Sequence, residues 1–109
     1  MKDCGCNSFE SLIAKMDDQT LPFSEKVINK TLKVRTFDPS YPEHLFKWHW
    51  DDEDRFIVPV NETDWKFQFD NELPQLITKE GIHIPKGVMH RLIKGTTELK
   101  LSIHVNINN

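Results

Sequence analysis

The chain has 109 residues, a formal net charge of −3, and 38% hydrophobic and 28% charged residues. This length is typical of one domain and leaves no room for a separate substrate domain. Charges of both signs are mixed, so the chain lacks the basic footprint of a nucleic-acid or membrane-surface binder. No apolar run approaches the length of a transmembrane helix, and the N-terminus has no signal-peptide core. A cytoplasmic location is therefore expected.

Residues 1–30 are expected to form an N-terminal arm. Ser8 is a candidate cap for a short helix over residues 9–18, where apolar side chains recur at helical spacing. Cys4 and Cys6 lie too close together to staple a fold, so two reduced thiols are the expected state. Chelation of a soft metal by this cysteine pair is the alternative.

From Thr31 onward the apolar pattern changes to a period of two, which is typical of half-buried strands. Many short strands separated by turn signals indicate an all-β sandwich or barrel, and composition alone does not choose between the two. The last strand alternates most regularly, from Leu99 to Ile107. The expected strands span residues 31–37, 45–50, 55–60, 65–69, 75–78, 82–84, 88–93 and 99–107.

A tight turn at Pro85-Lys86-Gly87 is the feature around which the chain is organised. Proline presets the backbone of such a turn and glycine permits a positive φ, so the reversal is specified locally. On the returning strand, alternation places Val88, His90 and Leu92 on one face. A histidine between two apolar neighbours points into an interior, which indicates a structural or functional partner for its ring.

The Pro-x-Gly-x-x-His spacing of residues 85–90 resembles the second conserved motif of the cupin superfamily, small β-barrels that often hold one metal ion. The resemblance implies a first motif about forty residues upstream, where residues 48–55 read Trp-His-Trp-Asp-Asp-Glu-Asp-Arg. His49 matches the first histidine of that motif. Asp51 replaces the second histidine, and Arg55 falls where a glutamate is expected.

The resemblance covers about residues 30 to 107. It implies a single cupin-like barrel, a double-stranded β-helix or jelly roll, over residues 31–109 behind the N-terminal arm. The runs 65–74 and 90–96 resemble a subgroup of short cupin-like proteins with no established activity. Cupins commonly dimerise, so a homodimer is expected.

An inward metal site follows if the strand through His49 continues to Arg55 without a bulge. Alternation then places His49, Asp51, Glu53 and Arg55 on one face, and His90 on a neighbouring strand can join them. Two imidazoles and a carboxylate are a good ligand set for Fe(II), Mn, Ni or Zn, and they leave coordination positions open. The expected metal ligands are His49, Asp51 and His90.

The charge of Arg55 disfavours metal binding at this site, because an unpaired guanidinium beside a divalent ion is repelled by several kcal/mol at an effective dielectric of about 20. Three interpretations stay open. Arg55 is held by a carboxylate such as Glu53 and a metal binds; Arg55 pairs with Asp51 or Asp54 and only ties two strands together; or Arg55 binds an anionic ligand through its planar fork.

The candidate ligand-binding residues are Arg55, Glu53, Trp65 and His104. The expected place of Trp65 is the core, with an aromatic wall at the barrel mouth as the alternative. His104 lies on the polar face of the last strand and joins the site only if that face lines the barrel. The remaining histidines, His44 and His83, are expected at the surface.

The expected function is that of a cupin-like protein that binds a divalent metal inside the barrel and acts on a small polar molecule. For an enzyme, the resemblance implies a dioxygenase, an isomerase or a lyase. The alternative is a non-catalytic module that binds or senses an anionic ligand through Arg55, with a degenerate metal site; a purely structural oligomerisation module is a third. An unpaired inward Arg55 favours the anion binder, and an Arg55 that points outward to a carboxylate partner favours the metal enzyme. The sequence names neither a substrate nor a reaction.

Overall fold

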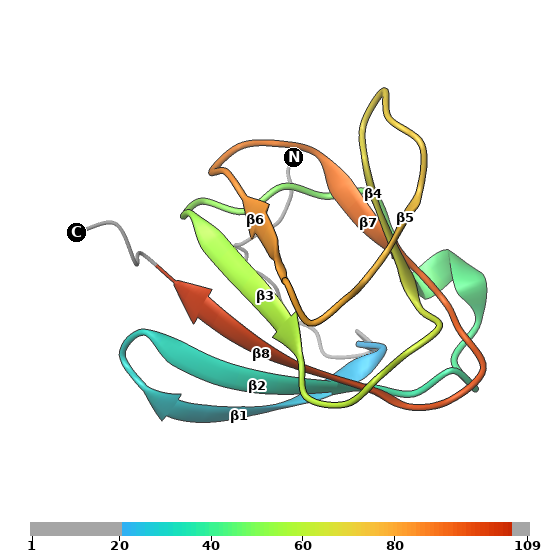
Figure 1. The fold of residues 1–109 in the computed structure, drawn as a ribbon, viewed down its shortest axis with the longest axis horizontal. Coiled ribbons are helices and arrows are strands. Elements are labelled where there is room, and N and C mark those ends of the chain that lie inside the picture. The colour runs from blue at the N-terminus through green and yellow to red at the C-terminus, as the bar shows by residue number, and fades with distance from the viewer. Residues whose placement is uncertain (1–20, 106–109) are drawn as a thin grey trace.

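The computed structural model describes residues 21–105, which form strands and loops with one short 3₁₀ turn (Figure 1). The helix predicted over residues 9–18 and both cysteines lie outside these described residues. No helix between residues 21 and 105 is both long and apolar enough to cross a membrane. The elements are β1 (Phe23–Asn29), β2 (Leu32–Phe37), η1 (Glu43–Leu45), β3 (Arg55–Pro59), β4 (Lys66–Phe69), β5 (Gln75–Leu76), β6 (Ile82–Ile84), β7 (His90–Ile93) and β8 (Leu99–Val105).

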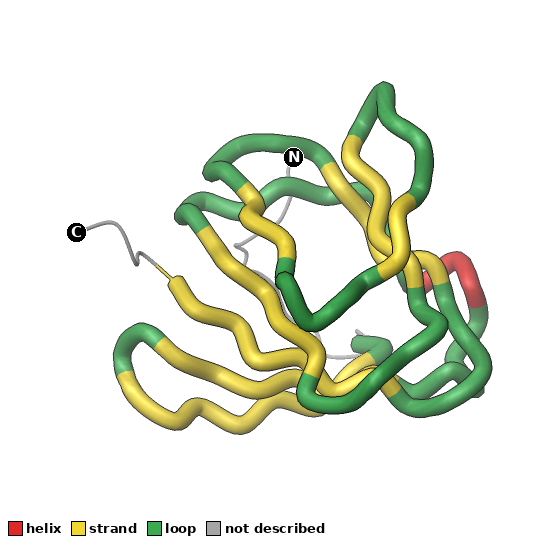
Figure 2. The backbone as a smooth tube through the Cα atoms, in the orientation of Figure 1, coloured by secondary structure: helices red, strands yellow, loops and turns green. Residues whose placement is uncertain are grey.

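The strands form two antiparallel sheets (Figure 2). One sheet has the order β1-β2-β8-β3-β6 and the other has the order β5-β4-β7. Strand β8 is central to the larger sheet, because it pairs with β2 on one side and with β3 on the other. The all-β fold is therefore confirmed.

The core lies on the inner faces of the two sheets. Strand β8 buries every second side chain and leaves those between them more exposed, as its alternation predicted. Trp65, which precedes β4, is 0% exposed and packs its ring 6.1 Å from Phe37 and 5.4 Å from Phe46. These aromatic contacts join the two sheets, and each fully buried large apolar side chain stabilises the fold by about 1.5–3 kcal/mol.

The strand predicted over residues 45–50 is wrong. Pro42, with φ at −60°, begins the 3₁₀ turn η1, and Phe46 after the turn is buried in the core. Beyond it the chain is irregular, and His49 makes only an isolated bridge to His90. The exposed Trp48 and Trp50 supplied an alternation that does not belong to a strand.

Strand β1 was not predicted, since residues 23–29 fell within the expected arm. It is an edge strand with most of its side chains exposed, so its sequence lacks the apolar alternation that marks a half-buried strand. Strands β7 and β5 are each two residues shorter than expected: β7 begins at His90, and β5 ends at Leu76. Strand β8 is described as far as Val105.

Candidate metal centre

The turn at residues 85–87 forms as the sequence predicted and holds two distant segments together. Gly87 has φ at +81°, a conformation that glycine adopts without a steric penalty. Its backbone N–H donates to the carbonyl of Asp51 at 2.9 Å, and the N–H of Lys86 donates to the Asp54 carboxylate at 2.8 Å. The turn before β7 is therefore fixed against the acidic segment before β3.

An isolated antiparallel bridge places His49 beside His90. The N–H of His49 donates to the carbonyl of His90 at 3.0 Å, and the N–H of His90 donates to the carbonyl of His49 at 2.8 Å. The two imidazole rings lie 4.3 Å apart, and the His90 ring stacks on Phe67 at 5.2 Å. Backbone pairing and ring stacking together fix the direction of both side chains.

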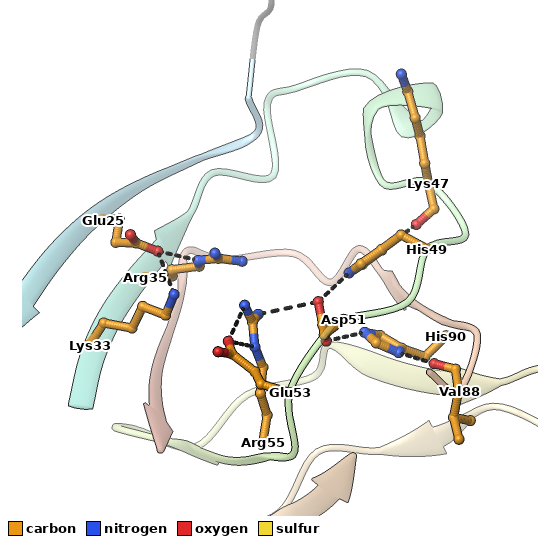
Figure 3. A network of polar contacts seen from close by, with 10 residues as sticks. All are labelled: Glu25, Lys33, Arg35, Lys47, His49, Asp51, Glu53, Arg55, Val88 and His90. Carbon is orange, nitrogen blue, oxygen red and sulfur yellow. Dashed lines mark hydrogen bonds and ion pairs between the residues drawn. The ribbon is translucent and has the colours of Figure 1, made fainter. Parts of the chain in front are cut away.

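Asp51 completes a cluster of three side chains (Figure 3). The Nε2 atom of His90 lies 3.3 Å from Asp51 Oδ2, and the Nε2 atom of His49 lies 3.9 Å from Asp51 Oδ1. One ligand atom from each residue lies within 4.8 Å of the other two. Atoms bound at about 2.0–2.2 Å to one ion are separated by roughly 3–4.4 Å, so this cluster could hold a metal ion.

The ring tautomers leave acceptor atoms facing the centre of the cluster. Nδ1 of His90 lies 2.8 Å from the carbonyl of Val88, and Nδ1 of His49 lies 2.9 Å from the carbonyl of Lys47. A carbonyl oxygen only accepts, so Nδ1 carries the proton in both rings, and Nε2 of a neutral ring presents a lone pair. Asp51 Oδ2 is buried without a hydrogen-bond partner among residues 21–105. Three convergent acceptors, one of them this unpartnered carboxylate oxygen, fit a bound cation.

The protonation states also suit a metal. Burial, with repulsion from His90, lowers the pKa of His49 to about 4, although 42% of its side chain is accessible. Burial opposes ionisation of Asp51, but the charge of Arg55, whose Nη1 atom lies 3.5 Å from Asp51 Oδ1, holds the pKa of Asp51 well below its usual value. Near neutral pH the cluster therefore offers a neutral His49 ring and an ionised carboxylate, the forms that ligate metals.

Arg55 lies beside the cluster and is paired. Its Nε and Nη2 atoms lie 2.9 and 2.8 Å from Glu53 Oε2, and its Nη1 atom lies 3.5 Å from Asp51 Oδ1. Asp54, the other partner considered from the sequence, accepts the backbone N–H of Lys86 instead. Glu53 thus neutralises the guanidinium, so Arg55 and a metal ion can coexist. The side chain of Arg55 is only 13% exposed, so it is paired but does not point outward.

The structure does not bring Trp65 or His104 to this cluster. Trp65 is fully buried, and its Nε1–H donates to the carbonyl of Thr97 at 2.5 Å. The side chain of His104 lies on the face of β8 opposite the buried residues, with its ring 6.4 Å from Phe56. His44 and His83 are exposed, as expected.

Three further charged residues near the cluster were not singled out in the sequence. Arg35 on β2 donates from Nε to Glu25 Oε1 on β1 at 2.5 Å, and Lys33 Nζ lies 4.0 Å from the same oxygen (Figure 3). The only sequence signal is that Lys33 and Arg35 share a strand face with Phe37. Whether this face points inward depends on the pairing of Arg35 with Leu101, which the sequence does not specify.

No protein-family model matches the sequence, and no curated protein matches it. Solved structures do resemble the fold. A cupin domain from Bordetella pertussis Tohama I is 21% identical, with a TM-score of 0.52, over 81% of this chain and 98% of that one. The DMSP lyase DddQ from Ruegeria pomeroyi DSS-3 is 11% identical, with a TM-score of 0.59, over 81% of this chain and 49% of that one.

HppE in its Fe(II) form is 18% identical, with a TM-score of 0.52, over 88% of this chain and 61% of that one. This chain thus spans about half the length of DddQ and less than two thirds of HppE. Similarity at this level of identity concerns the fold. The chain is cupin-like in its fold, as the Pro-x-Gly-x-x-His spacing predicted.

Proposed function

We propose that this protein binds one divalent metal ion through His49, Asp51 and His90 and acts on a small molecule at that ion. The observation that carries the proposal is the convergence of two imidazole Nε2 atoms on a carboxylate whose Oδ2 atom has no hydrogen-bond partner among residues 21–105. Fe(II), Mn, Ni and Zn all accept such a ligand set. Among the structural neighbours, HppE was determined with Fe(II), which makes iron the first metal to test.

Three protein ligands leave coordination positions for water and a small molecule, and a bound metal would supply Lewis-acid or redox activation there. The side chain of His49 is partly exposed, so the cluster borders solvent on that side, whereas His90 and Asp51 are buried. The carbonyls of Val88 and Lys47 orient the two rings, and Arg55 helps to hold Asp51 in place. Such outer partners support a metal site nearly as much as its ligands do.

The alternative, an anion-binding module built on Arg55, has less support. The Nε and Nη2 atoms of Arg55 contact Glu53, so this fork is not free for a ligand. Ligand-binding roles for Arg55, Glu53, Trp65 and His104 stay predictions, as do a homodimer and a cytoplasmic location.

Metal affinity in single-ligand variants tests the proposal. We expect the wild type to bind one equivalent of Fe²⁺, Mn²⁺, Ni²⁺ or Zn²⁺. His49→Ala and His90→Ala should bind it at least about 100-fold more weakly, since loss of an outer partner alone costs roughly 10- to 100-fold. Competition against a chromophoric chelator measures the affinity, and circular dichroism checks the fold.

The matched control is His44→Ala, because His44 is exposed and is not part of the cluster. It should bind metal as the wild type does. If the wild type takes up none of these ions, or if His90→Ala keeps the same affinity, the proposed function is wrong.

A further inference from the structure

A row of charged side chains leads from the candidate metal centre to β2 and the edge strand β1 (Figure 3). The ion pairs in this row join three cations to three carboxylates. The cations are Lys33, Arg35 and Arg55, and the carboxylates are Glu25, Asp51 and Glu53. With both histidines neutral, this row has no net charge before a metal binds.

Arg35 differs from Arg55 in what its guanidinium contacts. Its side chain is 18% exposed, and its Nε atom donates to Glu25. Its two terminal nitrogens have no hydrogen-bond partner among residues 21–105, and the guanidinium points toward the side of Asp51 and His49 (Figure 3). Arg55 uses Nε and Nη2 on Glu53. The two terminal nitrogens of Arg35 are therefore available to donate hydrogen bonds to a ligand on the side of the candidate metal centre.

A divalent ion at the centre would raise the charge of the row from zero to +2. Charge left uncompensated in a partly buried site is unfavourable, and an anionic ligand removes it. The cations of the row already repel one another. Burial, followed by repulsion from Arg55 and Arg35, lowers the pKa of Lys33. A bound metal ion would therefore favour the binding of a negatively charged group close to Arg35.

We propose that the small molecule is an anion and that Arg35 binds its carboxylate or phosphonate group next to the metal. This inference rests on the proposed function and names the substrate class of that site. A guanidinium fork matches two oxygens of either group, and its charge does not depend on pH in the working range. Lys33 is less suited, because its ammonium group has no planar fork.

Anion binding to the Co²⁺-loaded protein tests the proposal, with glycolate and methylphosphonate as probes and glycolamide as the neutral match of glycolate. We expect the wild type to bind an anion more tightly than glycolamide, and Arg35→Met to bind that anion about 10- to 100-fold more weakly. Co²⁺ affinity should stay nearly unchanged. Calorimetry measures anion affinity, and the visible absorption of Co²⁺ reports an anion that reaches the metal.

Two further variants sharpen this test. Arg91→Met is the matched control, because Arg91 contacts Gln68 and the Trp48 ring outside the cluster, so it should bind anions as the wild type does. Glu25→Gln should bind anions several-fold more tightly, because its amide oxygen still accepts from Arg35 Nε while the competing negative charge is gone. Misfolding would weaken anion binding, so tighter binding by Glu25→Gln would not come from a folding defect.

The proposal is overturned if glycolamide binds as well as both anions, or if Arg35→Met and Glu25→Gln both match the wild type. Arg35 would then be only a structural ion pair. The anion whose affinity depends more on Arg35 identifies the carboxylate or phosphonate class. If the wild type takes up neither Co²⁺ nor any of Fe²⁺, Mn²⁺, Ni²⁺ and Zn²⁺, the proposed function fails. The metal-free protein then decides on Arg35 separately: anion binding that Arg35→Met weakens supports the role of Arg35, and equal binding overturns it.

Discussion

At the scale of single residues, the protonation state of His49 affects both metal binding and the stability of the fold. Its ring must be neutral to ligate a metal, and its surroundings keep it so, because burial and His90 lower its pKa to about 4. The unfolded chain has no such environment, and its histidine takes up a proton near 6.5. Between these two values the unfolded state binds more protons, so the stability of the metal-free protein falls as the pH falls.

We therefore expect the metal-free protein to lose about 1–2 kcal/mol of unfolding free energy between pH 7 and pH 4.5, a figure reduced for the partial exposure of His49. Asp51 acts at lower pH, since its lowered pKa gives stability that is present above 3.8 and lost below it. Urea denaturation at several pH values measures the slope. His49→Gln should flatten it, whereas His44→Gln should not; equal slopes in all three proteins would contradict this account.

At the scale of elements, the turn at residues 85–87 sets the position of His90. Gly87 has a positive φ, and a Cβ atom at this position would meet nothing within 4 Å. The cost of a side chain here is therefore conformational, and we expect Gly87→Asn to destabilise least, Gly87→Ala by about 1–2 kcal/mol and Gly87→Val most. Thermal unfolding gives the order, and metal affinity should fall in parallel. An equal melting temperature for all three variants would show that the turn is not strained.

Some of these elements and contacts are specified by the local sequence and others are not. The turn and the inward His90 were predicted because proline, glycine and two-residue alternation act locally. His49, Asp51 and His90 do meet, although the unbroken strand through His49 on which their prediction depended does not form. Strand β1 was missed because its exposed side chains show no apolar alternation. The position of Arg35 was missed because it depends on register: Arg35 pairs with Glu25 on one side and Leu101 on the other, contacts that no local pattern encodes.

At the scale of the whole molecule, the two sheets are joined through Trp65. Its ring packs against Phe37 from the larger sheet, and its indole N–H donates to Thr97. We expect Trp65→Ala to lower the free energy of unfolding by about 3–5 kcal/mol, a large share of a typical total. Trp50→Ala, at a side chain that is 41% exposed, should cost less than about 1 kcal/mol. Urea denaturation compares them, and a stable Trp65→Ala protein with lost ligand binding would favour the aromatic-wall interpretation instead.

The central claim is that one metal ion binds between His49, Asp51 and His90. Anomalous diffraction from crystals of the Zn²⁺-loaded protein, measured on both sides of the zinc absorption edge, tests it most directly. We expect a single strong anomalous peak within about 2.0–2.2 Å of both Nε2 atoms and an Asp51 oxygen. A zinc peak elsewhere in the molecule, or zinc-loaded crystals with no peak at these three residues, would contradict the claim.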